Sequence, residues 1–420
     1  MDMRQEGRGC GRAAGANIQT QSFVQSMNET FRNALELYPS MGKVDLAAAI
    51  RDYDRERLAC EPDYAKFPEM RGLLERHLGE REGFREASGL DETAAAFQFS
   101  WHWFLSRRVN SRHLSRYDLI APRGCTNVFF PHGKDGVTVS DNRDDWPRVE
   151  YREKIPKFRV PPPARTSKVS FGQGGASSAC LLDEDPQCCF PCDPFELMPK
   201  ECYDDIHAAV EFLTRYREFY GPGNQIWCDS KLNAVAVEKT TCRVAFRWPT
   251  VNGAVCVTAC SYVDPELNAY KKERTRKAMA IKGETEANSP DWNYFEGSDA
   301  RHRRLIALTD AEAKHGATLW GAFDCVADTK VSFPARVCLA GEKTFPDREP
   351  NANWSLTEYA AVITGPKRRA LYRSMQDLVH PKPIYSYKPK LVLGKGVKMR
   401  PEWQADVDKG LCELAPEETV

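Results

Sequence analysis

One short stretch of the sequence brings together residue types that can break an amide bond. Cys125 lies between Gly124 and Thr126, and Asp145 follows twenty residues later. Between them, residues 131–136 read Pro-His-Gly-Lys-Asp-Gly, a composition typical of a β-hairpin turn. Because a hairpin returns the chain to its starting point, we expect the cysteine and the aspartate to be neighbours. A thiol beside a carboxylate is a candidate nucleophile with an orienting acid.

Such a site needs few further groups. A free cysteine thiol has a pKa of about 8.5 and is the most nucleophilic side chain near neutral pH. If the peptide bond before Cys125 were broken, that residue would also carry an α-amine with a pKa of about 7.7 to 8.0. The amine could take the thiol proton. One residue would then supply both the nucleophile and the base, without a histidine.

Several further segments of the chain, together with this hairpin, match the motifs of one protein family. They include a glycine-punctuated amino terminus, a stretch ahead of the cysteine and a later hairpin. The matching segments are 11–15, 83–91, 124–126, 134–136, 145–146 and 232–238. Together these motifs resemble those of the isopenicillin N acyltransferase family of cysteine N-terminal-nucleophile hydrolases. The similarity covers most of the chain.

The resemblance implies a fold, a division of the chain and an activity. The fold is α+β, a four-layer αββα sandwich of the N-terminal-nucleophile type. Self-cleavage between Gly124 and Cys125 divides the chain into a helical pro-segment, 1–124, and a catalytic chain, 125–420, and the two stay associated. The activity is hydrolysis of a small N-acyl or β-aminoacyl amide through an acyl-enzyme. The resemblance implies no cofactor and no metal.

The resemblance also assigns roles within the hairpin. Cys125 attacks the carbonyl of Gly124 during self-cleavage and a substrate amide afterwards. Asp145 holds or polarises the new α-amine. The backbone N–H of Thr126 serves an oxyanion hole, a donor often worth a few kcal/mol. Asp144, one residue from the proposed acid, is expected on the other side of its strand.

Three positions depart from the family pattern or match it loosely. Residues 258–262 read Thr-Ala-Cys-Ser-Tyr where the family has Thr-Asn-His, so the asparagine that donates to the oxyanion is missing. Asn142 stands where many relatives carry an arginine, and Arg143 follows it; either could hydrogen-bond near the thiol. Arg301 resembles an arginine of related hydrolases, or it belongs to a solvated helix face.

Other interpretations of the same residues stay open. Cys125 is one of fifteen cysteines, and cysteine is among the residues most often buried, so it could be a core thiol and Asp145 a turn carboxylate. The acyl group could pass to an amine acceptor instead of water. The chain could also be a binding or structural relative that neither cleaves itself nor catalyses.

Composition disfavours several classes of protein. The 420 residues carry 59 Lys plus Arg and 59 Asp plus Glu, without the basic excess typical of nucleic-acid binding. No segment approaches the ~18 apolar residues that a membrane span needs. The amino terminus lacks the apolar region of a secretory signal. We therefore expect a cytoplasmic protein with reduced cysteines and a small-molecule amide as its partner, with no nucleic acid and no membrane.

Three other motifs carry weaker predictions. Cys188, Cys189 and Cys192, with Cys180 and Cys202 nearby, lack the second paired set that structural zinc needs, which favours loop and core thiols. The basic residues within 271–277 indicate a solvated helix face. The glycine-rich residues 172–178 lack the Gly-Lys-Ser/Thr ending of a phosphate loop.

Hydrophobic periodicity predicts the elements that carry these motifs. Helices are expected near 23–35, 44–50, 67–74, 94–105, 201–219, 266–282 and 301–315. Four strands, 225–229, 233–238, 242–248 and 254–262, are expected to form one antiparallel meander, and short strands are expected around 337 and 360–364. Helices and strands in separate groups indicate α+β layers.

Overall fold

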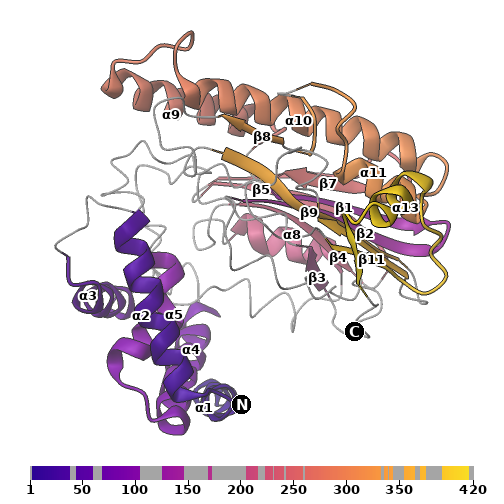
Figure 1. Ribbon diagram of the computed structural model, residues 1–420. Coiled ribbons are helices and arrows are strands. Elements are labelled where there is room, and N and C mark those ends of the chain that lie inside the picture. Colours follow the sequence, from indigo (N-terminus) through magenta and orange to yellow (C-terminus); the bar gives the residue numbers. More distant parts are fainter. Residues whose placement is uncertain are drawn as a thin grey trace. The chain divides into compact units, whose positions relative to one another are not determined.

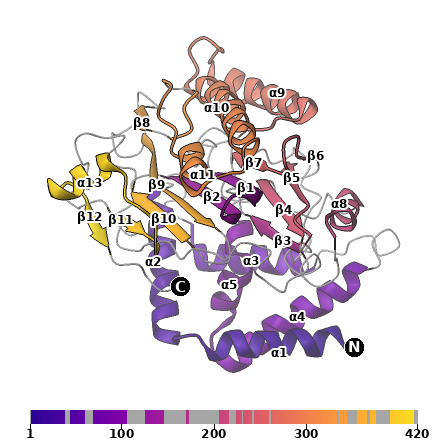
Figure 2. The same ribbon diagram turned by 90° about the vertical axis from the view of Figure 1, so that its right-hand side faces the viewer.

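The computed structural model describes most of the chain as two compact units, one helical and one mixed (Figures 1 and 2). The described residues of the helical unit are those up to 104, and the described residues of the mixed unit begin at 125. The described ranges are 2–37, 44–59, 69–104, 125–145, 169–172, 205–215, 223–229, 231–240, 243–258, 261–332, 335–338, 340–343, 354–364, 369–374 and 390–415.

Five helices form the described part of the first unit. They are α1 (Met3–Ala16), α2 (Thr20–Leu37), α3 (Leu46–Leu58), α4 (Glu69–Ser88) and α5 (Glu92–Phe104). The sequence predicts the last four. It does not predict α1, because its glycines lower intrinsic helix propensity by about 1 kcal/mol each.

The glycines of α1 let its backbone touch that of α4. A Cβ atom at Gly11 would lie 2.0 Å from the carbonyl oxygen of Glu80, and one at Gly83 would lie 2.1 Å from that of Arg8. Real Cβ atoms do not approach so closely, so these positions accept only glycine without a shift of the helices. Arg8 also pairs with Glu86 across the contact. Backbone proximity thus compensates for the low helix propensity.

The mixed unit contains a large sheet in which eight strands are described. Its strands are β1 (Cys125–Gly133), β2 (Gly136–Asp145), β7 (Val255–Thr258), β8 (Ala340–Lys343), β9 (Trp354–Thr364), β10 (Arg369–Ser374), β11 (Lys390–Leu393) and β12 (Glu413–Ala415). The order is β12-β11-β10-β9-β2-β1-β7, with β8 paired to β9. The expected hairpin is confirmed, because β1 and β2 pair antiparallel.

A smaller sheet contains β3 (Val169–Gly172), β4 (Gly223–Asp229), β5 (Ala234–Lys239) and β6 (Val244–Arg247), in that order. The predicted four-strand meander is therefore wrong in its last member, since β7 pairs with β1 of the large sheet. Every residue of β7 is buried, whereas those of β6 are half-buried. A strand that is apolar on both faces gains more by crossing into the larger sheet.

The helices of the mixed unit are α8 (Ile206–Arg215), α9 (Pro265–Lys282), α10 (Pro290–Ala313), α11 (Leu319–Val326) and α13 (Pro401–Asp408). The helix predicted from residue 301 begins earlier, at Pro290, where the Ser289 hydroxyl accepts a hydrogen bond from the N–H of Trp292. Val337 does not lie in a strand; the nearest one is β8.

The strand β1 is buried on both faces. Val128 and Phe130 join a core with residues of α10 and α11, and Phe129 packs with Ile226 and Ala236 of the small sheet. The helix α8 contacts β4 and β6 of that sheet. Figure 1 shows α10 and α11 on one side of the large sheet. The unit is mixed helix and sheet, and the α+β class is confirmed.

The contact between α1 and α4 predicts opposite effects for two glycines of one helix. Gly11→Ala should lower the stability of the helical unit by about 1 to 3 kcal/mol, because the new methyl group overlaps the Glu80 carbonyl. Gly9→Ala is the control, since a Cβ there meets nothing within 4 Å and should raise stability by up to about 1 kcal/mol. Urea unfolding of the full chain, followed by circular dichroism, measures both. Equal stability of the two variants would contradict the close contact.

Candidate active site

Three strand ends meet where the sequence places the nucleophile. Cys125 is the first residue of β1 and lies opposite Arg143 of β2, while Thr126 lies opposite Thr258, the last residue of β7. Asp145 ends β2, two positions beyond Arg143. The structure describes the backbone of Cys125 and Asp145 but not their side chains, and Gly124 lies outside the described residues.

The register changes near Asp145 on the other side of β2. Arg143 lies opposite Tyr359 of β9, but Asp144 lies opposite Thr357, so Glu358 is an extra residue in β9. Such a bulge bends the strand that contains it, and bulges are common beside active sites. The bend in β9 therefore falls beside the end of β2 that carries the proposed acid.

A buried polar row crosses the three strands one residue into β1. Asn142, Thr126 and Thr258 are neighbours in register and at most 1% exposed. The side-chain amide of Asn142 donates to the Val326 carbonyl of α11 over 2.8 Å. Its amide oxygen and both threonine hydroxyls have no hydrogen-bond partner among the described residues. The described side-chain hydrogen bond of Asn142 is thus to α11, and a hydrogen bond near the Cys125 thiol stays a prediction.

Arg301 lies on α10, which contacts both β1 and β7. Arg301 is only 2% exposed, so the alternative that it belongs to a solvated helix face is wrong. The next residue, His302, is fully buried, with Nε2 at 3.4 Å from Nη2 of Arg247. Burial, reinforced by the Arg247 charge, holds the pKa of His302 well below its usual value. His302 is therefore neutral at physiological pH.

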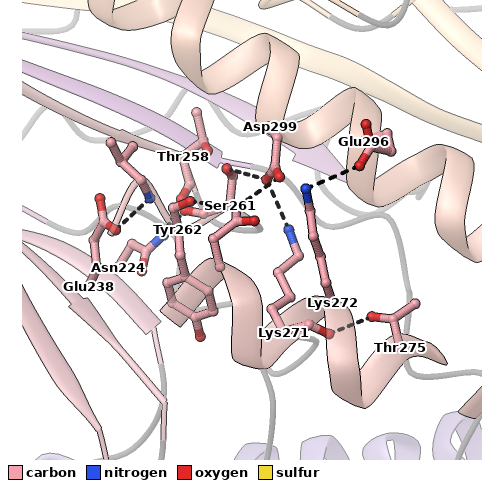
Figure 3. A network of polar contacts seen from close by, with 12 residues as sticks. Asn224, Glu238, Thr258, Ser261, Tyr262, Lys271, Lys272, Thr275, Glu296 and Asp299 are labelled. Atoms are coloured by element: carbon pink, nitrogen blue, oxygen red, sulfur yellow. Dashed lines mark hydrogen bonds and ion pairs between the residues drawn. The ribbon is translucent and has the colours of Figure 1, made fainter. Parts of the chain in front are cut away.

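A buried ionic network lies just beyond the end of β7 (Figure 3). The Ser261 hydroxyl donates to Oδ1 of Asp299 over 2.7 Å, and Nζ of Lys271 lies 3.2 Å from the same oxygen. The Asn268 amide donates to Oδ2 over 2.8 Å. Burial alone would raise the pKa of Asp299, but the Lys271 charge and these hydrogen bonds outweigh it and lower the pKa.

Lys271 corrects a sequence prediction. It begins the basic segment expected to be solvated, yet it is 1% exposed. The missed signal is a spacing of four residues along α9, since Leu267, Lys271, Thr275 and Met279 are all buried. One buried face of the helix thus includes a lysine that needs a carboxylate partner. Neither Lys271 nor Asp299 was identified as a site residue from sequence.

Two residues of the small sheet hold the chain that follows β7. Asn224 and Glu238 are cross-strand neighbours on β4 and β5. The Asn224 amide nitrogen donates to the carbonyls of Thr258 and Ser261 over 2.8 and 2.6 Å. Oε2 of Glu238 accepts from the backbone N–H groups of residues 263 and 264 over 2.6 and 3.0 Å. The sequence pattern identifies neither residue, because their partners are distant in sequence.

Among the residues that the structure describes, no group of three His, Cys, Asp or Glu is arranged to hold a metal ion. The cysteines from Cys180 to Cys202 and the glycine-rich residues 173–178 lie outside the described residues. Within the described ranges, no helix has the length and apolar content of a membrane span.

No protein-family model matches this chain, and no curated protein matches it either. The resemblance to the isopenicillin N acyltransferase family thus stays a prediction from the motifs quoted above.

The Lys271–Asp299 pair predicts a pH-dependent contribution to stability. Asp299→Asn should lower the free energy of unfolding at pH 7, because the buried ammonium loses its charged partner. The folded-state pKa of Asp299 is below its ordinary value of about 3.9, so this contribution is present above that value and is lost as the pH falls through the folded pKa. Urea unfolding should show a difference between wild type and variant that is the same at pH 7 and at about pH 5 and that shrinks as the pH falls below about 4.

The adjacent pair on the same two helices provides the control. Nζ of Lys272 lies 3.4 Å from Oε1 of Glu296, and the two side chains are 35% and 49% exposed. Glu296→Gln should change stability by less than about 1 kcal/mol at either pH. If the two variants behaved alike, the buried network would not contribute as its geometry indicates.

Proposed function

We propose that this chain is a self-processing cysteine amidohydrolase of the N-terminal-nucleophile type, acting on a small N-acyl or β-aminoacyl amide. The position of Cys125 is the main support. It opens β1, a strand paired on both sides by β2 and β7. A break in the chain before Cys125 would leave the new amino terminus on a strand already fixed in place, which favours catalysis by orientation.

The packing of the mixed unit supports the finer fold proposal. The helices α10 and α11 share a core with one face of the large sheet, while the other face packs on the small sheet, which α8 contacts. This succession of helix, sheet, sheet and helix is the layer order expected of an αββα sandwich. The motif resemblance and the layers thus favour the same family.

Self-cleavage in this proposal proceeds by an acyl shift. The Cys125 sulfur adds to the Gly124 carbonyl, the peptide C–N bond breaks, and the nitrogen takes a proton to become the free α-amine of Cys125. The acyl group is then a thioester on sulfur. Water opens that thioester, giving the carboxylate of Gly124 and restoring the thiol. The products are the pro-segment and a catalytic chain with an amino-terminal cysteine.

Turnover uses the same atoms. The α-amine of Cys125 takes the thiol proton, and the sulfur attacks the carbonyl carbon of the substrate amide. The C–N bond of the substrate breaks, and its leaving amine takes that proton from the α-amine. Water then releases the acid from the acyl-enzyme. We assign to Asp145 the orientation of the α-amine and to the N–H of Thr126 a place in the oxyanion hole. Arg301, on the helix that contacts β1 and β7, stays a proposed site residue on the motif resemblance alone.

Three buried thiols are poorer nucleophiles than a free cysteine. Burial raises the pKa values of Cys228, Cys256 and Cys325 above that of a free thiol. A buried, protonated thiol reacts slowly. These cysteines are core residues of the sheets and of α11, so none of the three competes with Cys125 as the proposed nucleophile.

The first test of the function is the mass of the purified chain. Self-cleavage before Cys125 should divide the 47.5 kDa protein into fragments of about 14 and about 33.5 kDa, in proportion to 124 and 296 residues. Cys125→Ala should remain whole and inactive, since alanine offers no nucleophile. Intact mass spectrometry of fresh and aged preparations measures both.

Cys10→Ala is the matched control, because Cys10 is an exposed free cysteine in the helical unit, and this variant should cleave normally. A wild type that stays at one mass would reject the hydrolase and favour a non-processing binding or structural relative. Incubation of the cleaved protein with N-acyl amino acids and β-alanyl amines, with and without an added amine, separates hydrolysis from acyl transfer by the product formed.

The second test separates Asp145 from its neighbour. Asp145→Asn should slow turnover at least about tenfold, because it removes the charge that stabilises the protonated α-amine. Folding should be almost unchanged, since the side chains have the same shape. Asp144→Asn should leave turnover nearly unchanged. Turnover and thermal melting of both variants check this, and a reversed result would move the acid to Asp144.

A further inference from the structure

We infer that Asn224 is a positioning residue that holds the end of β7 in register beside the start of β1. The inference rests on the proposed function and extends it to a residue on the other sheet, distant from Cys125 in sequence. Asn224 itself does not take part in bond breaking. Its contribution is to fix the backbone of the strand that lies against the nucleophile strand.

The two hydrogen bonds of Asn224 define its role. Its amide nitrogen donates to the carbonyls of Thr258 and Ser261 over 2.8 and 2.6 Å, and the residue is fully buried. The reversed amide orientation would place an oxygen against two carbonyl oxygens, so the donor assignment is fixed by its surroundings. One side chain therefore bridges both ends of the short connection between these two residues.

The geometry is specific for a side-chain amide. The Asn224 amide oxygen is buried and has no hydrogen-bond partner among the described residues. A buried acceptor without a partner destabilises the fold, so an apolar residue of similar size would serve packing better. We infer that an asparagine occupies this position because its amide holds two carbonyl groups in place, which an apolar side chain cannot do.

Glu238 complements Asn224 on the adjacent strand. While Asn224 donates to carbonyl groups, the Glu238 carboxylate accepts from the N–H groups of residues 263 and 264. From the helical side, Asp299 accepts from the Ser261 hydroxyl. The chain from Thr258 to residue 264 is thus held from the small sheet and from α10 (Figure 3).

Side-chain hydrogen bonds and backbone pairing meet at the end of β7. The described ladder between β1 and β7 ends at the pair of Thr126 and Thr258. At this end of β7, the Asn224 amide adds hydrogen bonds to the carbonyls of Thr258 and Ser261. Because Thr126 follows the proposed nucleophile, a shift of β7 would move the strand against which the reacting residue is aligned. Displacements of about 1 Å can lower a catalysed rate about a hundredfold.

Asn224→Asp tests the inference with little change in shape. The full-length variant should cleave itself at least about tenfold more slowly than wild type at pH 8, because a carboxylate cannot donate to either carbonyl. At lower pH the variant carboxyl becomes protonated and regains one donor. The ratio of variant to wild-type cleavage rate should therefore recover as the pH falls towards 5, which a loss of packing alone would not produce.

Asn252→Asp is the matched control. Asn252 donates to the Ala313 carbonyl over 2.7 Å, in the turn that precedes β7 and thus at its opposite end. This variant loses a similar side-chain donor away from Cys125, and its rate ratio should stay near one at every pH. First-order rates of fragment formation are measured by mass spectrometry, at temperatures where thermal melting shows each protein fully folded.

Each outcome decides one question. A wild type that never cleaves rejects the proposed function. A cleaving wild type with an equally fast Asn224→Asp variant overturns the positioning role and leaves the function intact. If Asn224→Asp does not fold, Asn224→Ser, which retains one hydroxyl donor in a smaller side chain, is measured in the same way. Slower cleavage by a folded Asn224→Ser protein supports the inference, and an unchanged rate overturns it.

Discussion

Backbone pairing on both sides of β1 is the constraint on which the rest of the mixed unit depends. Arg143 of β2 lies opposite Cys125 on one side, and Thr258 of β7 lies opposite Thr126 on the other. The strand is apolar on both faces further along, where Val128 and Phe129 join separate cores. Two neighbouring strands and two cores leave β1 a single register, since a slip by one residue would exchange its faces.

The end of β7 is held by polar groups in the protein interior. Burying ions such as Lys271 and Asp299 removes them from water, and an apolar pair is often as stable. Charged and amide groups, unlike apolar ones, form hydrogen bonds that fix the orientation of their partners. Asn224 donates to two carbonyl groups, and Asp299 accepts from a serine, an asparagine and a lysine. These contacts fix Ser261 and the residues that lead from it into α9. Positional precision of this kind is what a reacting centre requires.

The helical unit is stabilised in a different way. Glycines place the backbones of α1 and α4 in contact, and arginine–glutamate pairs such as Arg8–Glu86 flank them. The exposed ion pairs contribute little individually, so the close packing carries most of the specificity. In the mixed unit, by contrast, position is set by strand register and by buried polar side chains.

The sequence by itself determined the elements that depend on local contacts. The hairpin that carries Cys125 and Asp145 followed from its turn residues, and most helices followed from their hydrophobic spacing. Only the tertiary structure decided that β7 leaves the small sheet, that Lys271 and Arg301 are buried, and that Asn224 reaches the end of β7. The reason is physical: a turn or a helix face is encoded within a few residues, whereas sheet membership and the partner of a buried polar group depend on surfaces that segments distant in sequence present only after folding.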